Sequence, residues 1–159
     1  MKNIVALFMF ILILFAVVMW YPTNNAYPPS NIFLLKRARE ELIGLTKTNP
    51  SAKSDYLSFL LDTRMSELES LHEQKQFERE KFVKIIATAS KYTATAGKLT
   101  GLINEHELTD KVQPAKDQFS RHKEKLNELS LMYPSGHEGW KFLSDAKNYL
   151  DAYESELGK

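Results

Sequence analysis

The fold class is clearest in the stretch LTDKVQPAKDQFSRHKEKLNELSLMY, residues 108–133. The side chains of its repeating face are spaced by three or four residues, which places them on one side of an α-helix. This heptad face comprises Leu108, Val112, Ala115, Phe119, His122, Leu126, Leu129 and Tyr133. Because a proline inside a helix removes a hydrogen bond, Pro114 indicates either a helix that begins around Gln113 or a bend at the proline.

Helical patterns of the same spacing lie on both sides of this stretch. The expected helices run from Ser30 or Asn31 to near Thr48, from Pro50 to about Glu73, through Phe82–Ile103, and through Leu143–Leu157. Asn49 and Pro50 mark a helix start, because asparagine caps a first turn and proline is tolerated at the first helical position. Turns are expected near Lys75, which divides an otherwise very long helix, and at residues 133–136. The pattern predicts an all-α fold in which an N-terminal transmembrane helix is followed by an antiparallel bundle of four to five helices.

The middle of the third expected helix, residues 87–97, is rich in alanine, threonine, serine and glycine. Small residues permit close approach of two helices, so a tightly packed crossing is the first interpretation. The second is a groove for a partner or ligand.

The N-terminal run from Ile4 to Trp20 contains no charged residue. As a helix it would span roughly 26 Å, close to the ~30 Å hydrocarbon core of a bilayer. We therefore expect a signal-anchor transmembrane helix over residues 1–21, a Pro/Asn-rich tether over residues 22–31, and a helical bundle over residues 32–159. The lipid bilayer is then the first partner of the chain.

The sequence also predicts how this segment is processed and oriented. Bulky residues end the apolar run, and the nearest plausible cleavage site, after Ala26, has Asn24 at the minus-three position, so we expect an uncleaved anchor. If the signal were cleaved, the protein would be secreted. Lys2 precedes the run, and the first charge after it is Lys36, so the N-terminus should be cytoplasmic and the C-terminal domain extracytoplasmic.

Charge and cysteine content narrow the function classes. The chain carries 21 basic and 20 acidic residues, and this balance gives no electrostatic basis for binding nucleic acid. It contains no cysteine, so disulfides and a lipid-modified cysteine are excluded.

Few residues suggest chemistry. Three His-Glu pairs begin at His72, His106 and His137, but none has a second histidine four residues after the first, so exposed surface positions are expected. His122 lies on the heptad face and is interpreted as a core histidine with satisfied hydrogen bonds. Carboxylate pairs such as Glu67 with Glu69 lack apolar surroundings in the sequence. We therefore assign no catalytic, cofactor-binding or metal-ligating residue and expect no enzyme.

The passage PSNIFLLKRAREE, residues 29–41, followed by Asn49-Pro50 and the leucine stripe from Leu57 to Leu71, resembles a bacterial family known as a domain of unknown function. Its members have one membrane segment, a short tether and long helices, and some resemble extracytoplasmic parts of anti-sigma-factor-like proteins. This chain departs from the family at Leu34 and Leu35, where many members have a proline. The resemblance implies a membrane-anchored extracytoplasmic helical domain and supplies no reaction or cofactor.

The resulting functional expectation is a non-enzymatic, single-pass membrane protein that presents an extracytoplasmic helical interaction or sensor domain. Its partner would be another protein or a second copy of the chain, and the heptad spacing of residues 108–133 suggests self-association through a coiled coil. The alternative is a small-ligand- or metal-binding helical bundle of the cell envelope, with His122 and the small residues 87–97 lining its cavity.

Overall fold

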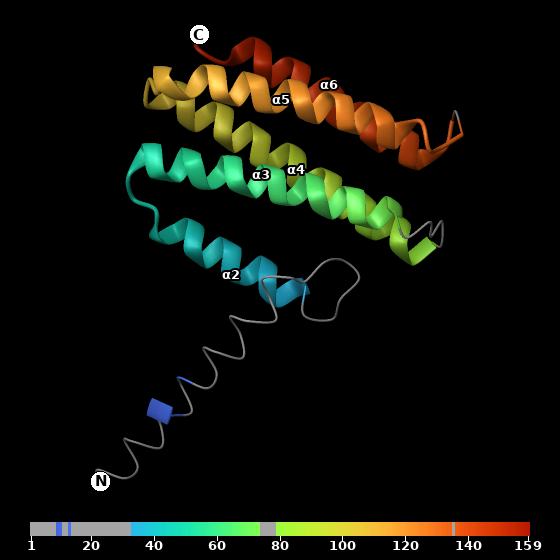
Figure 1. Cartoon of the computed structure of the whole chain (residues 1–159), viewed down its shortest axis with the longest axis horizontal. Coiled ribbons are helices and arrows are strands. Elements are labelled where there is room, and N and C mark those ends of the chain that lie inside the picture. Colours follow the sequence, from blue (N-terminus) through green and yellow to red (C-terminus); the bar gives the residue numbers. More distant parts are fainter. Residues whose placement is uncertain (1–8, 11–12, 14–32, 74–78, 135) are drawn as a thin grey trace. The chain divides into compact units, whose positions relative to one another are not determined.

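The computed structural model describes residues 9–10, 13, 33–73, 79–134 and 136–159, with the side chains of residues 79–82 excepted. Over these ranges all regular secondary structure is α-helical, which confirms the all-α prediction (Figure 1). The helices are α2 (Phe33–Thr46), α3 (Pro50–Glu73), α4 (Arg79–Glu105), α5 (Thr109–Ser130) and α6 (Glu138–Glu156).

The chain divides into two units, Met1–Ile43 and Gly44–Lys159. The second unit contains α3 to α6, which form the predicted helical bundle, with four helices. Most of α2 belongs to the first unit. The expected tether and nearly all of the expected membrane helix lie outside the described residues. In the part of the chain that is described, no helix combines the length and the apolar character needed to cross a membrane.

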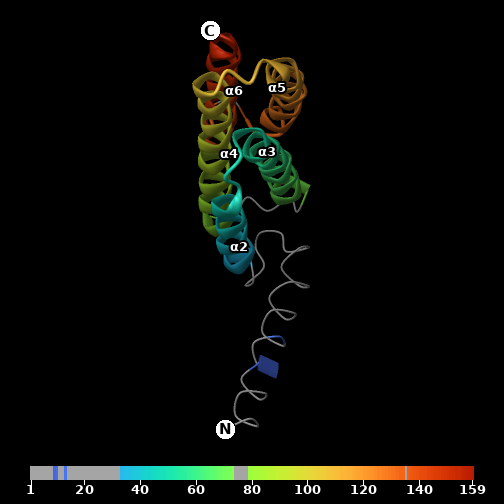
Figure 2. The same cartoon turned by 90° about the vertical axis from the view of Figure 1, so that its left-hand side faces the viewer.

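The four helices of the second unit form two antiparallel hairpins. α3 packs on α4, and α5 packs on α6 (Figures 1 and 2). The hairpins meet through α4 with α6 and, less extensively, through α3 with α5 and α4 with α5. Because successive helices run in opposite directions, α3 is parallel to α5 and α4 is parallel to α6. The bundle therefore has two parallel contacts between its hairpins.

The predicted start of α3 is confirmed. The backbone N–H groups of Ser51 and Ala52 donate to the Asn49 Oδ1 atom at 2.9 and 3.2 Å, and the helix begins at Pro50. It ends at Glu73, as expected. The turn expected near Lys75 lies outside the described residues.

Of the two interpretations of Pro114, a helix start around Gln113 is excluded, because α5 starts at Thr109 and contains the proline. At this position the proline removes only the bond that its own N–H would make to the carbonyl group of Asp110, in the exposed first turns. Leu108 and Val112 pack against the hydrophobic core, which stabilises the turns that precede the proline.

The heptad face of residues 108–133 is directed into the bundle. Leu108 and Val112 are partly buried, and the other six positions are buried: Ala115, Phe119, His122, Leu126, Leu129 and Tyr133. The inward orientation predicted for this face is confirmed. Since the face is covered by other helices of the same chain, it does not offer the free coiled-coil surface that its spacing suggested.

The small residues of α4 allow a close crossing with α6. A Cβ atom on Gly97 would lie 2.9 Å from the hydroxyl oxygen of Tyr153, so the tyrosine occupies the space that a side chain would need. Ala89 and Ala96 are buried in the core. The tightly packed crossing is therefore the interpretation that the geometry supports.

Candidate functional site

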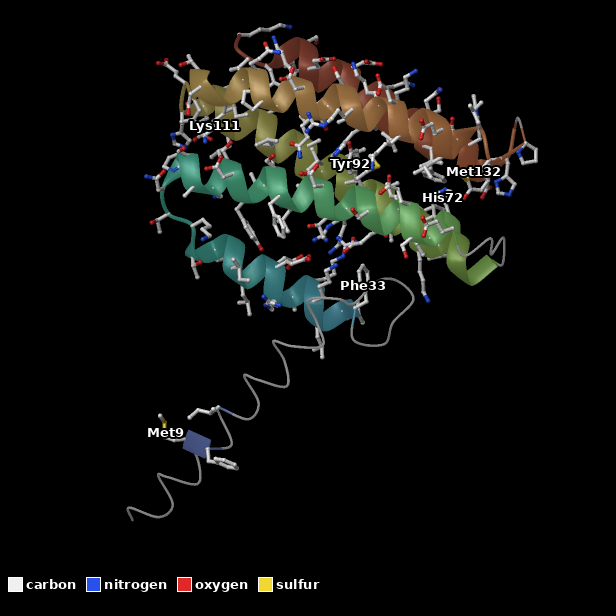
Figure 3. All side chains as sticks on the ribbon, viewed as in Figure 1. Met9, Phe33, His72, Tyr92, Lys111 and Met132 are labelled. Carbon is white, nitrogen blue, oxygen red and sulfur yellow. The ribbon has the colours of Figure 1, made fainter. Side chains whose placement is uncertain are left out.

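A buried polar network joins three helices near the middle of the bundle. His122 of α5 lies between Tyr92 of α4 and Asp62 of α3, with 3.0 Å from Tyr92 Oη to His122 Nδ1 and 2.9 Å from His122 Nε2 to Asp62 Oδ1. Tyr92 is 0% exposed and His122 is 4% exposed, whereas the Asp62 side chain is 58% exposed. Figure 3 labels Tyr92 at this central position. The prediction that His122 is a core histidine with satisfied hydrogen bonds is confirmed.

The partners of the two ring nitrogens define the protonation state of neutral His122. A carboxylate is only an acceptor, so the proton lies on Nε2, which donates to Asp62. Nδ1 is then an acceptor and receives the hydroxyl proton of Tyr92. Neutral His122 therefore uses one donor and one acceptor, and each has a partner.

Gln118, one turn before His122 on α5, extends the network along α3. Its amide nitrogen Nε2 donates to Asp62 Oδ1 at 2.8 Å and to the backbone carbonyl of Ser58 at 2.9 Å. The Ser58 hydroxyl donates to Gln118 Oε1 at 2.8 Å. Gln118 is buried, so these bonds replace the water that its amide group has lost.

Ion pairs continue the contact between α3 and α5 in both directions. Lys111 Nζ lies 2.7 Å from Asp55 Oδ1 near one end, and Lys125 pairs with Glu69 toward the other. We call this set of contacts the polar seam; it comprises Asp55–Lys111, Ser58–Gln118, Asp62–Gln118, Asp62–His122 and Glu69–Lys125. Along the polar seam the residue numbers increase in the same direction on α3 and on α5, because the two helices are parallel.

Burial controls the proton affinities at the centre of the network. Loss of hydration lowers the pKa of His122, and this effect outweighs the opposing charge of Asp62. The cations Arg121 and Lys125 lower this pKa further. Burial also raises the pKa of Tyr92, and the charge of Asp62 adds to that increase. Both groups are therefore held in their neutral forms.

The order carboxylate, imidazole, hydroxyl resembles a catalytic relay, but its geometry does not allow nucleophilic catalysis. The hydroxyl group of Tyr92 is enclosed, so a substrate has no access to it. Its raised pKa also makes the nucleophilic phenolate less available. The described residues contain no group of three or more His, Asp or Glu side chains arranged to hold a metal ion. The chemical capacity of this network is the uptake of a proton at His122.

A second histidine is buried where α3 ends, contrary to the surface position expected for His72. Its Nδ1–H donates to the Leu68 carbonyl at 2.6 Å, and its ring meets Tyr133 edge-on with 5.3 Å between centroids. His72 is 8% exposed because Tyr133, from the segment after α5, covers it. The other two histidines of the His-Glu pairs, His106 and His137, are exposed as expected.

The ring nitrogen Nε2 of His72 is buried and makes no hydrogen bond to the residues that the structure describes. Burial lowers the pKa of His72, and the hydrogen bond to Leu68 opposes this effect. Tyr133 also stacks on His137 with 5.2 Å between centroids, and burial raises the pKa of Tyr133 to about 12. The three rings form an aromatic cluster at this end of the bundle.

Glu67, whose sequence neighbours gave no sign of apolar surroundings, is buried beside a cation. Its side chain is 0% exposed and lies 3.0 Å from the guanidinium group of Arg64, which is also buried. Glu69, in contrast, reaches the polar seam and pairs with Lys125. Because the two carboxylates are two residues apart on α3, they point to nearly opposite sides of the helix and meet different environments.

An apolar tip is exposed at the connection from α5 to α6, defined by Leu131, Met132 and Trp140. These side chains are 75%, 56% and 40% exposed, respectively. The close contact between Gly139 and the Tyr133 ring brings the start of α6 next to the segment that holds Leu131 and Met132. Figure 3 shows Met132 at the same end of the bundle as His72 and opposite Lys111.

Comparison with protein-family models, with curated proteins and with solved structures finds no match for this chain. The sequence indicated His122 through its place on the heptad face, but it did not indicate Asp62, Tyr92 or Gln118 as its neighbours. These residues belong to ordinary amphipathic helices, so their meeting depends on how the hairpins pack.

Proposed function

We propose that this chain is a non-enzymatic, single-pass membrane protein whose extracytoplasmic helical bundle binds another protein through the apolar tip. The clustering of the exposed side chains of Leu131, Met132 and Trp140 at the connection from α5 to α6 is the observation that carries this proposal. Methionine and aromatic side chains are enriched in protein–protein interfaces, where they fill pockets of the partner.

The membrane assignment rests on the apolar run from Ile4 to Trp20 and on the position of Lys2 before it. Met9, Phe10 and Ile13, the described residues of this run, are 53–63% exposed, as expected of side chains whose contacts are with lipid. The resemblance of residues 29–71 to a family of membrane-anchored bacterial domains also supports the membrane assignment. The N-terminus is then cytoplasmic, and the bundle lies outside.

The proposed position of the bundle outside the cytoplasm can be tested with a fusion of alkaline phosphatase to the C-terminus of the full chain. This enzyme matures only outside the cytoplasm. An active fusion that sediments with membranes at high salt is expected. A second fusion with residues 4–20 deleted should be inactive. Activity in the soluble extracytoplasmic fraction would instead indicate a cleaved signal, and inactivity of the full-length fusion would refute the orientation.

Self-association is a second form of the same proposal, but it needs a surface other than the heptad face of α5. That face is covered within the chain by the other helices of the bundle. In this form of the proposal, a second copy meets the apolar tip. The crosslinking experiment below distinguishes the two forms, because a homodimer has twice the mass of the chain.

The ligand-binding alternative receives no comparable support. Both ring nitrogens of His122 already have hydrogen-bond partners, so the ring has no lone pair left for a metal. Gly97, which this alternative places in a cavity wall, lies against Tyr153, as expected for the tightly packed crossing. The residues proposed for a cavity thus make internal contacts.

Binding through the tip is tested by placing a photoreactive amino acid at Met132 and irradiating intact cells. The proposal predicts one discrete adduct, which the additional substitution Trp140→Ala should weaken at least several-fold. The matched control places the same amino acid at Ala94, an exposed position on α4. Equal adducts from both positions, or none from Met132, would overturn the role of the tip.

A further inference from the structure

The two parallel contacts between the hairpins differ in chemistry. The polar seam joins α3 to α5 through hydrogen bonds and ion pairs, with His122 at its centre. The α4–α6 contact has a different character: Gly97 lies against Tyr153, and the Asn104 amide group bonds to the backbone at Glu156 and Gly158. Within the polar seam, the two ring nitrogens of His122 bond to both helices of the other hairpin, Nε2 to Asp62 of α3 and Nδ1 to Tyr92 of α4.

We propose that the polar seam opens in response to acid: uptake of a proton by His122 separates α3 from α5, while α4 and α6 remain in contact. The inference goes beyond the binding role of the apolar tip and does not depend on it. It rests on the position of one imidazole between a carboxylate on α3 and an enclosed hydroxyl group on α4.

Protonation converts Nδ1 of His122 from a hydrogen-bond acceptor into a donor. In the imidazolium ion both nitrogens are donors, so Nδ1 no longer accepts the hydroxyl proton of Tyr92. The hydroxyl group must then accept from Nδ1 and turn its own proton elsewhere inside a 0% exposed site. An unmatched buried donor destabilises the closed seam, because it has lost its hydrogen bonds to water without gaining a partner. Separation of α3 from α5 relieves this cost by admitting water.

The charged groups around His122 have opposite effects on its protonation. Asp62 on α3 favours the imidazolium ion, whereas Arg121 and Lys125 on α5 disfavour it. α4 contributes the neutral hydroxyl group of Tyr92. Lys125 is itself drawn to Glu69 across the seam. The balance favours neutral His122 in the closed seam, so an open seam binds the proton more tightly.

This linkage sets the size of the effect. If His122 in the open seam has the ordinary pKa of about 6.5, lowering the pH from 7.5 to 5.0 raises the ratio of open to closed molecules by at most about 30-fold. The polar seam is therefore expected to open at acidic pH and to close at neutral pH.

The absence of cysteine allows the test to be made with paired spin labels on the full chain in neutral detergent. Cysteines at Phe59 and Glu124, exposed positions of α3 and α5, report the distance across the seam. Cysteines at Ala94 and Asn148, exposed positions of α4 and α6, form the control pair. The proposal predicts a longer second population for the first pair at pH 5.0, and an unchanged distribution for the second.

Two variants link the opening to His122. His122→Gln keeps a neutral donor and acceptor and should remove the response between pH 7.5 and 5.0, whereas His106→Gln, at an exposed histidine, should leave it intact. Asp62→Asn removes the charge that favours imidazolium in the closed seam, so more molecules should open at pH 5.0 than in the parent chain. If circular dichroism shows that His122→Gln does not fold, Asp62→Asn tests whether protonation of His122 causes the opening.

Three results would overturn the inference. The first is an α3–α5 distance that does not change with pH in the parent chain. The second is equal separation of the control pair, which would indicate general unfolding. The third is a response that persists in a folded His122→Gln chain, or a smaller response in Asp62→Asn.

Discussion

The ring of Tyr133 occupies the space beside Gly139 where any larger residue would place its side chain. A Cβ atom at position 139 would lie 2.7 Å from Tyr133 Cε1 and 2.9 Å from Cδ1. The same ring meets His72 edge-on and stacks on His137. The glycine thus permits the aromatic cluster that closes this end of the bundle, below the apolar tip.

Gly139→Ala should lower the free energy of unfolding by about 1–3 kcal/mol, because the added methyl group must displace a ring that is buried on several sides. The measurement is chemical denaturation followed by circular dichroism. Gly101→Ala is the matched control, since nothing lies within 4 Å of a Cβ atom there. On an exposed helical position alanine should stabilise by about 0.5–1 kcal/mol. Stabilisation by both substitutions would show that the Tyr133 ring moves freely.

Gln118→Ala should lower the free energy of unfolding by about 2–3 kcal/mol. The substitution removes the hydrogen bonds to Ser58 and Asp62, and each typically contributes about 1 kcal/mol. Gln113→Ala, on the same helix, removes only an exposed bond to Asp117 and should change stability by less than about 0.5 kcal/mol. Similar values for the two variants would mean that the polar seam contributes little to stability.

Features that depend on one turn of chain were predictable from the sequence. Asn49 and Pro50 define the start of α3, because capping and the tolerance of proline at the first position are local effects. The turn before α6 was predictable for a similar reason: Gly136 has a φ of +88°, which glycine adopts readily. The heptad face of residues 108–133 identified six residues that are buried and two that are partly buried.

Features that depend on packing between distant segments were not predictable. The partners of His122 are 30 and 60 residues away along the chain, and periodicity alone does not say which helices become neighbours. His72 is buried by Tyr133, which belongs to the segment after α5. The early start of α5 likewise depends on the burial of Leu108 and Val112, which outweighs the missing bond of Pro114.

Tyr92→Phe should lower the free energy of unfolding by about 1–2 kcal/mol, because it leaves Nδ1 of His122 as a buried acceptor without a donor. Tyr149→Phe alters an exposed ring and should change stability by less than about 0.5 kcal/mol. Thermal and urea unfolding of both variants provide the comparison. A neutral effect of Tyr92→Phe would indicate that water reaches the ring nitrogen.

The free energy of unfolding should fall as the pH is lowered below about 6.5, the ordinary pKa of histidine in an unfolded chain. Burial lowers the pKa of both His72 and His122 in the folded state, so in this range the unfolded chain binds more protons than the folded one. Their contribution to stability is complete well above pH 6.5, is lost as the pH falls from about 6.5 toward the lower, folded pKa values, and changes no further below them. With two such groups the slope is at most about 2.7 kcal/mol per pH unit. Urea titrations from pH 7.5 to 5.0 measure this slope, which His122→Gln should reduce and His106→Gln should not; a stability that rises toward pH 5.0 would contradict the buried, neutral state of both rings.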